Sequence, residues 1–319
     1  MSINFSEEAV NLAVQTLSQR KTEAEEEQQR REFYVYSQLP EVSAMKRRIS
    51  DRYFNIIRLV ADHNNNAAES AEKLRSEIQE DQQRIRVLLT DLTGDPDYLD
   101  TPYTCPKCGD TGYFEGKRCE CMTTLLKQYA VDELNRNSSI TLRSFDEYVD
   151  SCYDSDKLKN HMNSMKRFFV DYCRNFPNNC RSLYMTGRTG LGKTFFSSCI
   201  ATELAGRGFA VAIGSVSDLL RKLENEQFGR SDGNTMELLL EADMLIIDDL
   251  GTEFKSQFNE SALYAILNGR INKKKLTIIS TNLNAEQLNE RYNERIASRI
   301  LGGFMPIIFS GSDLRQKIL

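Results

Sequence analysis

The stretch RSLYMTGRTGLGKTFFSS, residues 181–198, decides the fold. A short apolar run leads into a glycine-rich turn, which is followed by residues that can begin a helix. Residues 187–194 fit the pattern G-x-x-x-x-G-K-[ST] at every fixed position. Glycines let backbone N–H groups turn toward phosphates, and the N-terminus of the next helix adds partial positive charge. The stretch therefore predicts a phosphate-binding loop between a strand and a helix.

The same pattern gives each side chain a role. Lys193 is expected to reach the β- and γ-phosphates of ATP, and the hydroxyl of Thr194 to hold Mg²⁺. The residues predicted to bind the nucleotide are Gly187, Arg188, Thr189, Gly190, Leu191, Gly192, Lys193, Thr194 and Phe195.

Two later apolar runs end in polar residues. Residues 244–247 are followed by Asp248 and Asp249, and the run 276–281 is followed by Asn282. The carboxyl ends of parallel strands meet at one edge of a sheet, beside the phosphate loop. We expect Asp248 to hold Mg²⁺ through water and Asp249 to orient or activate the attacking water. Asn282 would bind the γ-phosphate or that water; a turn or a helix cap is the alternative, because Asn favours both.

Strands and helices alternate after residue 140. The expected strands are SLYMT, FAVAIGS, MLIID, LTIIST and MPIIF, and the expected helices lie near 194–205, 216–228, 235–241, 258–272 and 286–300. Continuous apolar strands separated by amphipathic helices are typical of a parallel sheet that is covered on both faces. The fold class predicted for this part is α/β.

The first hundred residues have a different texture. Residues 7–95 carry apolar side chains at gaps of three and four, which predicts helices. Residues 1–100 hold 13 Lys and Arg against 19 Asp and Glu, and the rest holds 28 against 27. Neither part has the basic balance of an autonomous duplex-DNA binder. A plain helical bundle or hairpin and a partner-docking module both fit, and the pattern does not choose between them.

A cluster of cysteines follows the helical region. Cys105, Cys108, Cys119 and Cys121 fall within 17 residues, and glycines between them suit a short hairpin. Four thiolates suit a closed, structural Zn²⁺ site, and an iron–sulfur cluster or a redox pair is the alternative. The predicted domains are thus a helical domain (1–95), a linker with the cysteine module (96–139) and an ATPase domain (140–319).

Three arginines are candidates for the device that stabilises charge during phosphoryl transfer. Arg295 and Arg299 lie four residues apart, on one face of a predicted helix, and Arg315 lies near the end of the sequence. Spacing alone does not favour any of the three.

Composition limits where the protein acts. The sequence begins without a basic and apolar leader, and no apolar run approaches the roughly 18 residues that span a bilayer. We expect a cytoplasmic protein without membrane contact.

Together, the motifs GRTGLGKT, LIIDDLGTE, IISTN, ERIASRI and FSGSDLR resemble the bacterial DnaC/DnaI helicase-loader group of AAA+ ATPases, which is close to the IstB-like transposition helpers. The resemblance covers residues 140–319 and implies an AAA+ core without a C-terminal helical lid. It makes Asn282 the sensor-1 residue, Arg299 the arginine finger with Arg295 beside it, and Arg315 the sensor-2 residue. It also brings Phe145 and Tyr148 toward adenine. The cysteine module ahead of the ATPase is similar to the DnaI-type arrangement.

The resemblance implies a function as well. It predicts an ATP-dependent loader that grips a hexameric DnaB-type replicative helicase with its front half and holds single-stranded DNA. Arg221 and Lys222 are candidate phosphate contacts, and a solvated helix face explains them equally well. ATP bound between protomers implies self-association, with hydrolysis timing assembly and release. The alternative is an IstB-like, ATP-dependent DNA-binding helper of a transposase. A small-molecule kinase is a third reading, for which the sequence shows neither a clear substrate lid nor a phosphoacceptor site.

Overall fold

The computed structural model describes residues 5–61, 67–136, 138–151, 153 and 155–311. The chain divides into two compact units, Val14–Cys121 and Met1–Ala13 together with Met122–Leu319. The division differs from the predicted segments 1–95, 96–139 and 140–319, because residues 122–136 belong to the same compact unit as the C-terminal α/β part. No helix among the described residues is both long enough and apolar enough to cross a membrane.

The unit Val14–Cys121 is mostly helical. Its helices are most of α1 (Glu7–Gln38), then α2 (Pro40–Ala61) and α3 (Ala67–Thr93). Val42, Met45 and Leu89 lie in one buried cluster between them. Arg48 and Arg52 both pair with Asp81 across α2 and α3. The predicted helices are therefore present, and α2 and α3 form the hairpin that their apolar stripes favour.

The cysteine module forms the end of the same unit. Strands β1 (Tyr113–Phe114) and β2 (Lys117–Arg118) pair antiparallel. Glu115 and Gly116 between them both have positive φ, 49° and 73°, which suits a two-residue hairpin turn. The expected hairpin is present.

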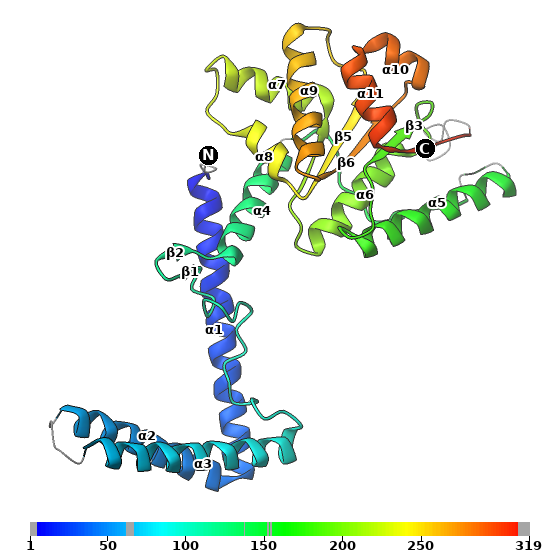
Figure 1. Cartoon of the computed structure of the whole chain (residues 1–319). Coiled ribbons are helices and arrows are strands. Elements are labelled where there is room, and N and C mark those ends of the chain that lie inside the picture. Colours follow the sequence, from blue (N-terminus) through cyan, green and yellow to red (C-terminus); the bar gives the residue numbers. More distant parts are fainter. Residues whose placement is uncertain (1–4, 62–66, 137, 152, 154, 312–319) are drawn as a thin grey trace. The chain divides into compact units, whose positions relative to one another are not determined.

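The second unit is built around a five-stranded parallel sheet (Figure 1). Its strands are β3 (Leu183–Thr186), β4 (Val211–Ser215), β5 (Met244–Leu250), β6 (Leu276–Thr281) and β7 (Met305–Ile308). They lie side by side in the order β4-β5-β6-β3-β7. The strand that precedes the phosphate loop, β3, is therefore separated from the strand with the acidic pair, β5, by β6 alone.

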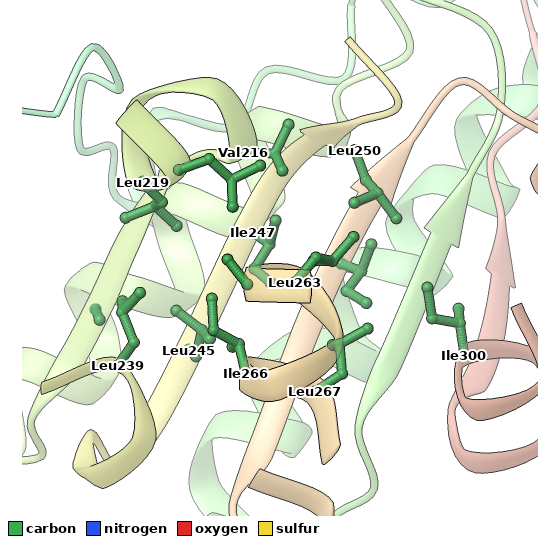
Figure 2. Close-up of a cluster of buried hydrophobic side chains, with 14 of the residues drawn as sticks. Val216, Leu219, Leu239, Leu245, Ile247, Leu250, Leu263, Ile266, Leu267 and Ile300 are labelled. Atoms are coloured by element: carbon green, nitrogen blue, oxygen red, sulfur yellow. The ribbon is translucent and has the colours of Figure 1, made fainter. Parts of the chain in front are cut away.

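Helices cover both faces of this sheet. The helical elements of the described part of this unit are α4 (Glu120–Arg136), the 3-10 turn η1 (Phe145–Glu147), α5 (Asp156–Asn175), α6 (Lys193–Gly206), α7 (Val216–Gln227), α8 (Thr235–Glu241), α9 (Gln257–Asn272), α10 (Ala285–Arg291) and α11 (Glu294–Gly303). Met244 and Ile246 of β5 point into a cluster with α5 and α6, whereas Leu245 and Ile247 point into a cluster with α7, α8 and α9. Figure 2 shows this second cluster. Both faces of the central strands β5 and β6 are buried, which is why each of these strands contains consecutive apolar residues.

Helix α4 covers the outer edge of the sheet at β4. The side-chain amide of Asn135 donates to the carbonyl of Val211 at 2.6 Å and accepts the N–H of Ile213 at 3.0 Å. These two bonds satisfy backbone groups that an edge strand otherwise leaves unpaired. Val131 and Leu134 of α4 are buried in the core of the same unit.

The helix expected over 286–300 is two helices. α10 ends at Arg291, the chain is extended at Tyr292 and Asn293, and α11 begins at Glu294. The side chain of Asn293 accepts the N–H of Ile296, at 3.1 Å, and so caps the second helix. The prediction of one continuous helix was wrong for this reason.

Candidate nucleotide site and metal centre

The phosphate loop connects β3 to α6. Gly192 precedes α6 with φ of 93° and makes no side-chain cap, so the first N–H groups of the helix remain available to a ligand. At Gly187, φ is 151° and a Cβ atom would lie 2.4 Å from the carbonyl oxygen of Phe309. Glycine is therefore required at Gly187 by close packing and at Gly192 by a left-handed backbone.

A cavity of about 810 Å³ lies over this loop. The predicted residues that line it are Thr189, Gly190, Leu191, Gly192, Lys193, Thr194, Phe195, Asp249, Asn282 and Tyr148. A further group of lining residues was not predicted: Arg143, Glu147, Val149, Ser151, Tyr153, Phe196 and Thr252. The volume of this cavity falls in the range that is typical of ligand-binding cavities.

Lys193 joins the loop to the end of β6. Its Nζ donates to the carbonyls of Gly187, at 2.7 Å, and Arg188, at 2.8 Å, and to Oδ1 of Asn282, also at 2.8 Å. Lys193 is only 5% exposed. The structure thus brings together two predicted site residues that are 89 positions apart.

Asp248 lies near the end of β5 and contacts the first turn of α6. Its Oδ2 accepts a hydrogen bond from the hydroxyl of Thr194 at 2.8 Å, and its Oδ1 accepts one from Ser280. Burial raises the pKa of the Asp248 carboxyl, these two hydrogen bonds lower it in part, and the neighbouring Asp249 raises it again. Thr194 and Asp248 are the ligand pair that Mg²⁺ takes in phosphate-loop enzymes, and their contact fits that role.

Asp249 has an unusual backbone. Its φ is 53°, which a non-glycine residue seldom adopts, and the pairing of β5 with β6 shifts register between Ile247 and Leu250. Its N–H donates to the hydroxyl of Ser280 at 3.1 Å. The bulge turns Asp249 toward the cavity, whereas Asp248 stays 3% exposed beneath it.

An aromatic group forms another wall of the cavity. The ring of Tyr148 lies 6.5 Å from that of Phe195 and 5.9 Å from that of Phe196, and the ammonium of Lys166 lies 5.0 Å from its centre. Phe145 is buried behind this wall, where it packs on Phe196 at 6.5 Å. Of the two aromatic residues expected near the base, Tyr148 lines the cavity and Phe145 supports it.

The four cysteines converge in the other unit. All four Sγ atoms lie within 4.8 Å of one another, with 3.8 Å between Cys105 and Cys119 and 3.5 Å between Cys108 and Cys121. A tetrahedral Zn²⁺ with Zn–S bonds of about 2.3 Å separates its sulfurs by about 3.8 Å. The donor set and the spacing therefore fit one zinc ion, whereas a disulfide needs about 2.05 Å.

A buried carboxylate holds the first half of this cysteine cluster. Asp110 is 1% exposed, and its two oxygens accept the N–H groups of Thr104, at 2.8 Å, and Cys105, at 2.9 Å. The N–H of Gly109 donates to the carbonyl of Cys105 at 2.9 Å. These bonds fix the turn between Cys105 and Cys108 by contacts that do not involve sulfur.

Part of the sequence is similar to known proteins. The family described as IstB-like ATP-binding protein matches residues 171–303. The replicative helicase loader DnaC of Escherichia coli K12 is 27% identical over 178 residues, which cover 55% of this chain and 70% of the relative. Over its C-terminal part the chain is therefore similar to the IstB-like ATP-binding proteins and to the replicative helicase loaders DnaC and DnaI.

A further relative and a solved structure also resemble part of this chain. The replicative helicase loader DnaI of Bacillus subtilis is 26% identical over 149 residues, or 43% of this chain and 48% of the relative. A crystal structure of the DnaC helicase loader aligns with a TM-score of 0.46 and 22% identity, over 52% of this chain and 96% of that one. The five-stranded parallel sheet with helices on both faces is the α/β fold class expected from the sequence.

Two of the three arginines that the resemblance implied, Arg295 and Arg299, do not line the cavity. Arg299 on α11 donates to Oδ1 of Asn268 and to the hydroxyl of Tyr264, each at 2.9 Å, and lies 4.5 Å from the centre of the Tyr264 ring. Arg295, one turn before it, is exposed. Neither residue lines the cavity of its own chain. Arg315 lies outside the described residues.

The two candidate DNA-contacting residues on α7 are engaged within the protein. Arg221 pairs with Asp218 at 2.8 Å, and Lys222 donates to the carbonyl of Leu134 at 2.7 Å. The side chain of Arg221 remains largely exposed, whereas that of Lys222 is half-buried. Of the two, Arg221 is the better placed to meet a phosphate.

Proposed function

We propose that this protein is an ATP-dependent loader of a hexameric, DnaB-type replicative helicase onto single-stranded DNA. The observation that carries the proposal is the site itself: Lys193 bonded to Asn282, and Thr194 bonded to Asp248, around one cavity. The relatives DnaC and DnaI, which are named replicative helicase loaders, support the choice of partner.

ATP with Mg²⁺ would supply a phosphoryl bond whose hydrolysis changes the assembly of the protein. Lys193 would exchange its bonds to the loop carbonyls for the β- and γ-phosphates, and Asn282 would then meet the γ-phosphate or the water beside it. Thr194 and Asp248 would hold Mg²⁺. Asp249, turned toward the cavity by the bulge in β5, would orient or accept a proton from the attacking water.

The nucleotide is proposed to lie between protomers. Arg299 does not line the cavity of its own chain, and an arginine supplied by a neighbour is an established device for stabilising charge in phosphoryl transfer. ATP binding would then favour self-association, and hydrolysis would favour release. Single-stranded DNA would bind to the assembled ATPase units, and the unit Val14–Cys121 with its zinc module would grip the helicase.

A loading assay tests this function. The helicase is mixed with circular single-stranded DNA coated by a single-strand binding protein, and unwinding of an annealed strand is measured with and without the loader. Unwinding that depends on the loader and on ATP, and that is lost with Lys193→Ala, is the expected result. Unwinding at the same rate without the loader would contradict the proposal.

The match to the IstB-like family supports one alternative, an ATP-dependent DNA-binding helper of a transposase. The cysteine module favours the loader, since such helpers are not typically preceded by one. If the protein covers duplex DNA in ATP and has no effect on the helicase, the alternative replaces the first proposal.

A further inference from the structure

A buried glutamate, Glu253, joins the loop after β5 to the junction between α10 and α11. It is 7% exposed. Its carboxylate accepts the N–H of Gly251 at 2.9 Å and the hydroxyl of Tyr292 at 2.5 Å, and it pairs with the guanidinium of Arg291 at 3.4 Å. Arg291 also donates to the backbone carbonyl of Glu253. One side chain thus ties together two segments that are about 40 residues apart in the sequence.

The first of these segments belongs to the nucleotide site. Gly251 follows the acidic pair, and the next residue, Thr252, donates to the carbonyl of Asp249 from its N–H at 3.2 Å and from its hydroxyl at 2.9 Å. Asp249 and Thr252 both line the cavity. Through its bond to Gly251, Glu253 is therefore attached to the loop that forms one edge of the nucleotide cavity.

The second segment is the start of α11. Tyr292 lies in the break between the two helices and is buried, and the next residue, Asn293, caps α11. Burial and the hydrogen bond to Glu253 raise the pKa of Tyr292, so its hydroxyl remains a donor at neutral pH. α11 carries Arg295 and Arg299 one and two turns further on. The position of its first turn sets the position of both arginines, because a short helix moves as a rigid body.

Stability alone does not explain this network. Taking a carboxylate and a guanidinium out of water is costly, and an apolar set of similar volume is often as stable. Within the part of the chain that the structure describes, Nε of Arg291 is buried and has no acceptor. A buried donor left without an acceptor costs free energy. A role in positioning α11 therefore explains the network better than a gain in stability does.

We propose that Glu253 is a positioning residue that fixes α11 against the loop after β5, so that Arg299 is presented correctly to the nucleotide of the neighbouring protomer. The inference rests on the proposed function, in which that arginine acts in trans. A substitution of Glu253 would lower hydrolysis in the site of the neighbouring protomer, although the contacts of Glu253 described above lie within its own chain.

Hydrogen exchange in the full-length protein tests the contact itself. Glu253→Gln keeps an acceptor oxygen but removes the charge, and Tyr292→Phe removes the donor. Glu290→Gln is the matched control, because Glu290 is exposed on α10 of the same region. We expect the two variants to exchange amides of residues 292–303 about tenfold faster than the control, with α6 unchanged. Unchanged exchange at 292–303 in both variants would overturn the proposal, whatever the assembly state.

A mixing experiment tests the direction of the effect. Each variant should bind ATP with about the wild-type affinity and hydrolyse it about tenfold more slowly. Glu253→Gln mixed with Asp249→Ala should regain activity, since the second variant supplies an intact finger to an intact site. Glu253→Gln mixed with Arg299→Ala should not. Where Asp249→Ala mixed with Arg299→Ala regains activity, the opposite pattern, or recovery in both of these mixtures or in neither, overturns the proposal.

One control pair separates this inference from the proposed function. Asp249→Ala mixed with Arg299→Ala should regain activity if the finger acts in trans. If that pair stays inactive, the trans arrangement in the proposed function fails, and the hydrogen-exchange result alone decides whether Glu253 holds α11.

Discussion

The hydroxyl of Thr194 donates a 2.8 Å hydrogen bond to Oδ2 of Asp248, across 54 positions of sequence. The bond joins the helix that begins at the phosphate loop to the strand that carries the acidic pair. It places the two expected magnesium ligands side by side, and it leaves a carboxylate buried in the sheet.

That burial predicts an unusual pH dependence. Burial raises the pKa of Asp248 in the folded protein above its unfolded value of about 3.9. Its contribution to stability is therefore complete below the unfolded pKa and is lost as the pH rises through the folded pKa. Asn does not ionise, so this loss of stability at higher pH is absent in Asp248→Asn. We expect the midpoint of thermal unfolding of the variant, relative to wild type, to rise between pH 4 and pH 7 in the absence of nucleotide.

Thermal unfolding of both proteins over this pH range, together with ATPase assays, checks that prediction. Asp248→Asn should be inactive while it is at least as stable as wild type at neutral pH. A relative midpoint that falls as the pH rises would contradict the burial argument.

Lys193→Ala should weaken ATP binding at least about tenfold, a cost of about 1.4 kcal/mol, because the loop loses its ammonium contact to the phosphates. Titration with a fluorescent ATP analogue measures this. Lys157→Ala, which removes an exposed lysine on α5, is the control and should bind normally. Normal ATP affinity in Lys193→Ala would contradict the assignment of residues 187–194 as the loop that binds the phosphates.

Arg299→Ala should leave ATP affinity near the wild-type value and lower the rate of hydrolysis in the assembled protein by about 10³-fold. Arg295→Ala on the same helix is the comparison, and the proposed assignment predicts the smaller effect for it. Steady-state hydrolysis at saturating ATP separates the two. A larger loss with Arg295→Ala would move the finger by one helical turn.

Zinc analysis of the purified protein should give about one metal per chain. Cys119→Ser should lose the metal, since it removes one of the four thiolates, whereas Cys180→Ser in the other unit should retain it. Chelation should loosen residues 104–121 and leave ATP binding unchanged, because the nucleotide site lies in the other compact unit. Iron in place of zinc would favour the cluster alternative.

The sheet could be predicted from the sequence to within a residue or two at most strand ends. Its strands are buried on both faces, so their apolar runs stand out, and turn residues mark where they stop. The phosphate loop and the two acids could be placed for the same reason, because the loop follows such a strand and the acids lie near the carboxyl end of another.

The break at Tyr292 could not be predicted from periodicity. Leu288, Tyr292, Ile296 and Ile300 are all buried and recur every four residues across both helices, so the apolar pattern continues through the interruption. The cap at Asn293 is visible only when the backbone is known.

Polar contacts between residues that are far apart in the sequence could not be predicted either. Ser280 reads as one more residue of an apolar strand, yet its hydroxyl bridges Asp248 and Asp249. Glu253 reads as a charge in a loop, yet it is buried against residues near position 291. Both roles depend on strand register and on contacts more than 30 positions away, which no local pattern encodes.

We propose above all that this protein binds a hexameric replicative helicase under the control of ATP. Native mass by multi-angle light scattering, measured for the protein with the DnaB-type helicase of its host, with and without ATP, tests it most directly. We predict a complex with a defined ratio of loader to hexamer that forms or dissociates according to the nucleotide, and that Lys193→Ala no longer responds to ATP. Absence of a complex under every nucleotide condition would contradict the account and leave only the ATP site.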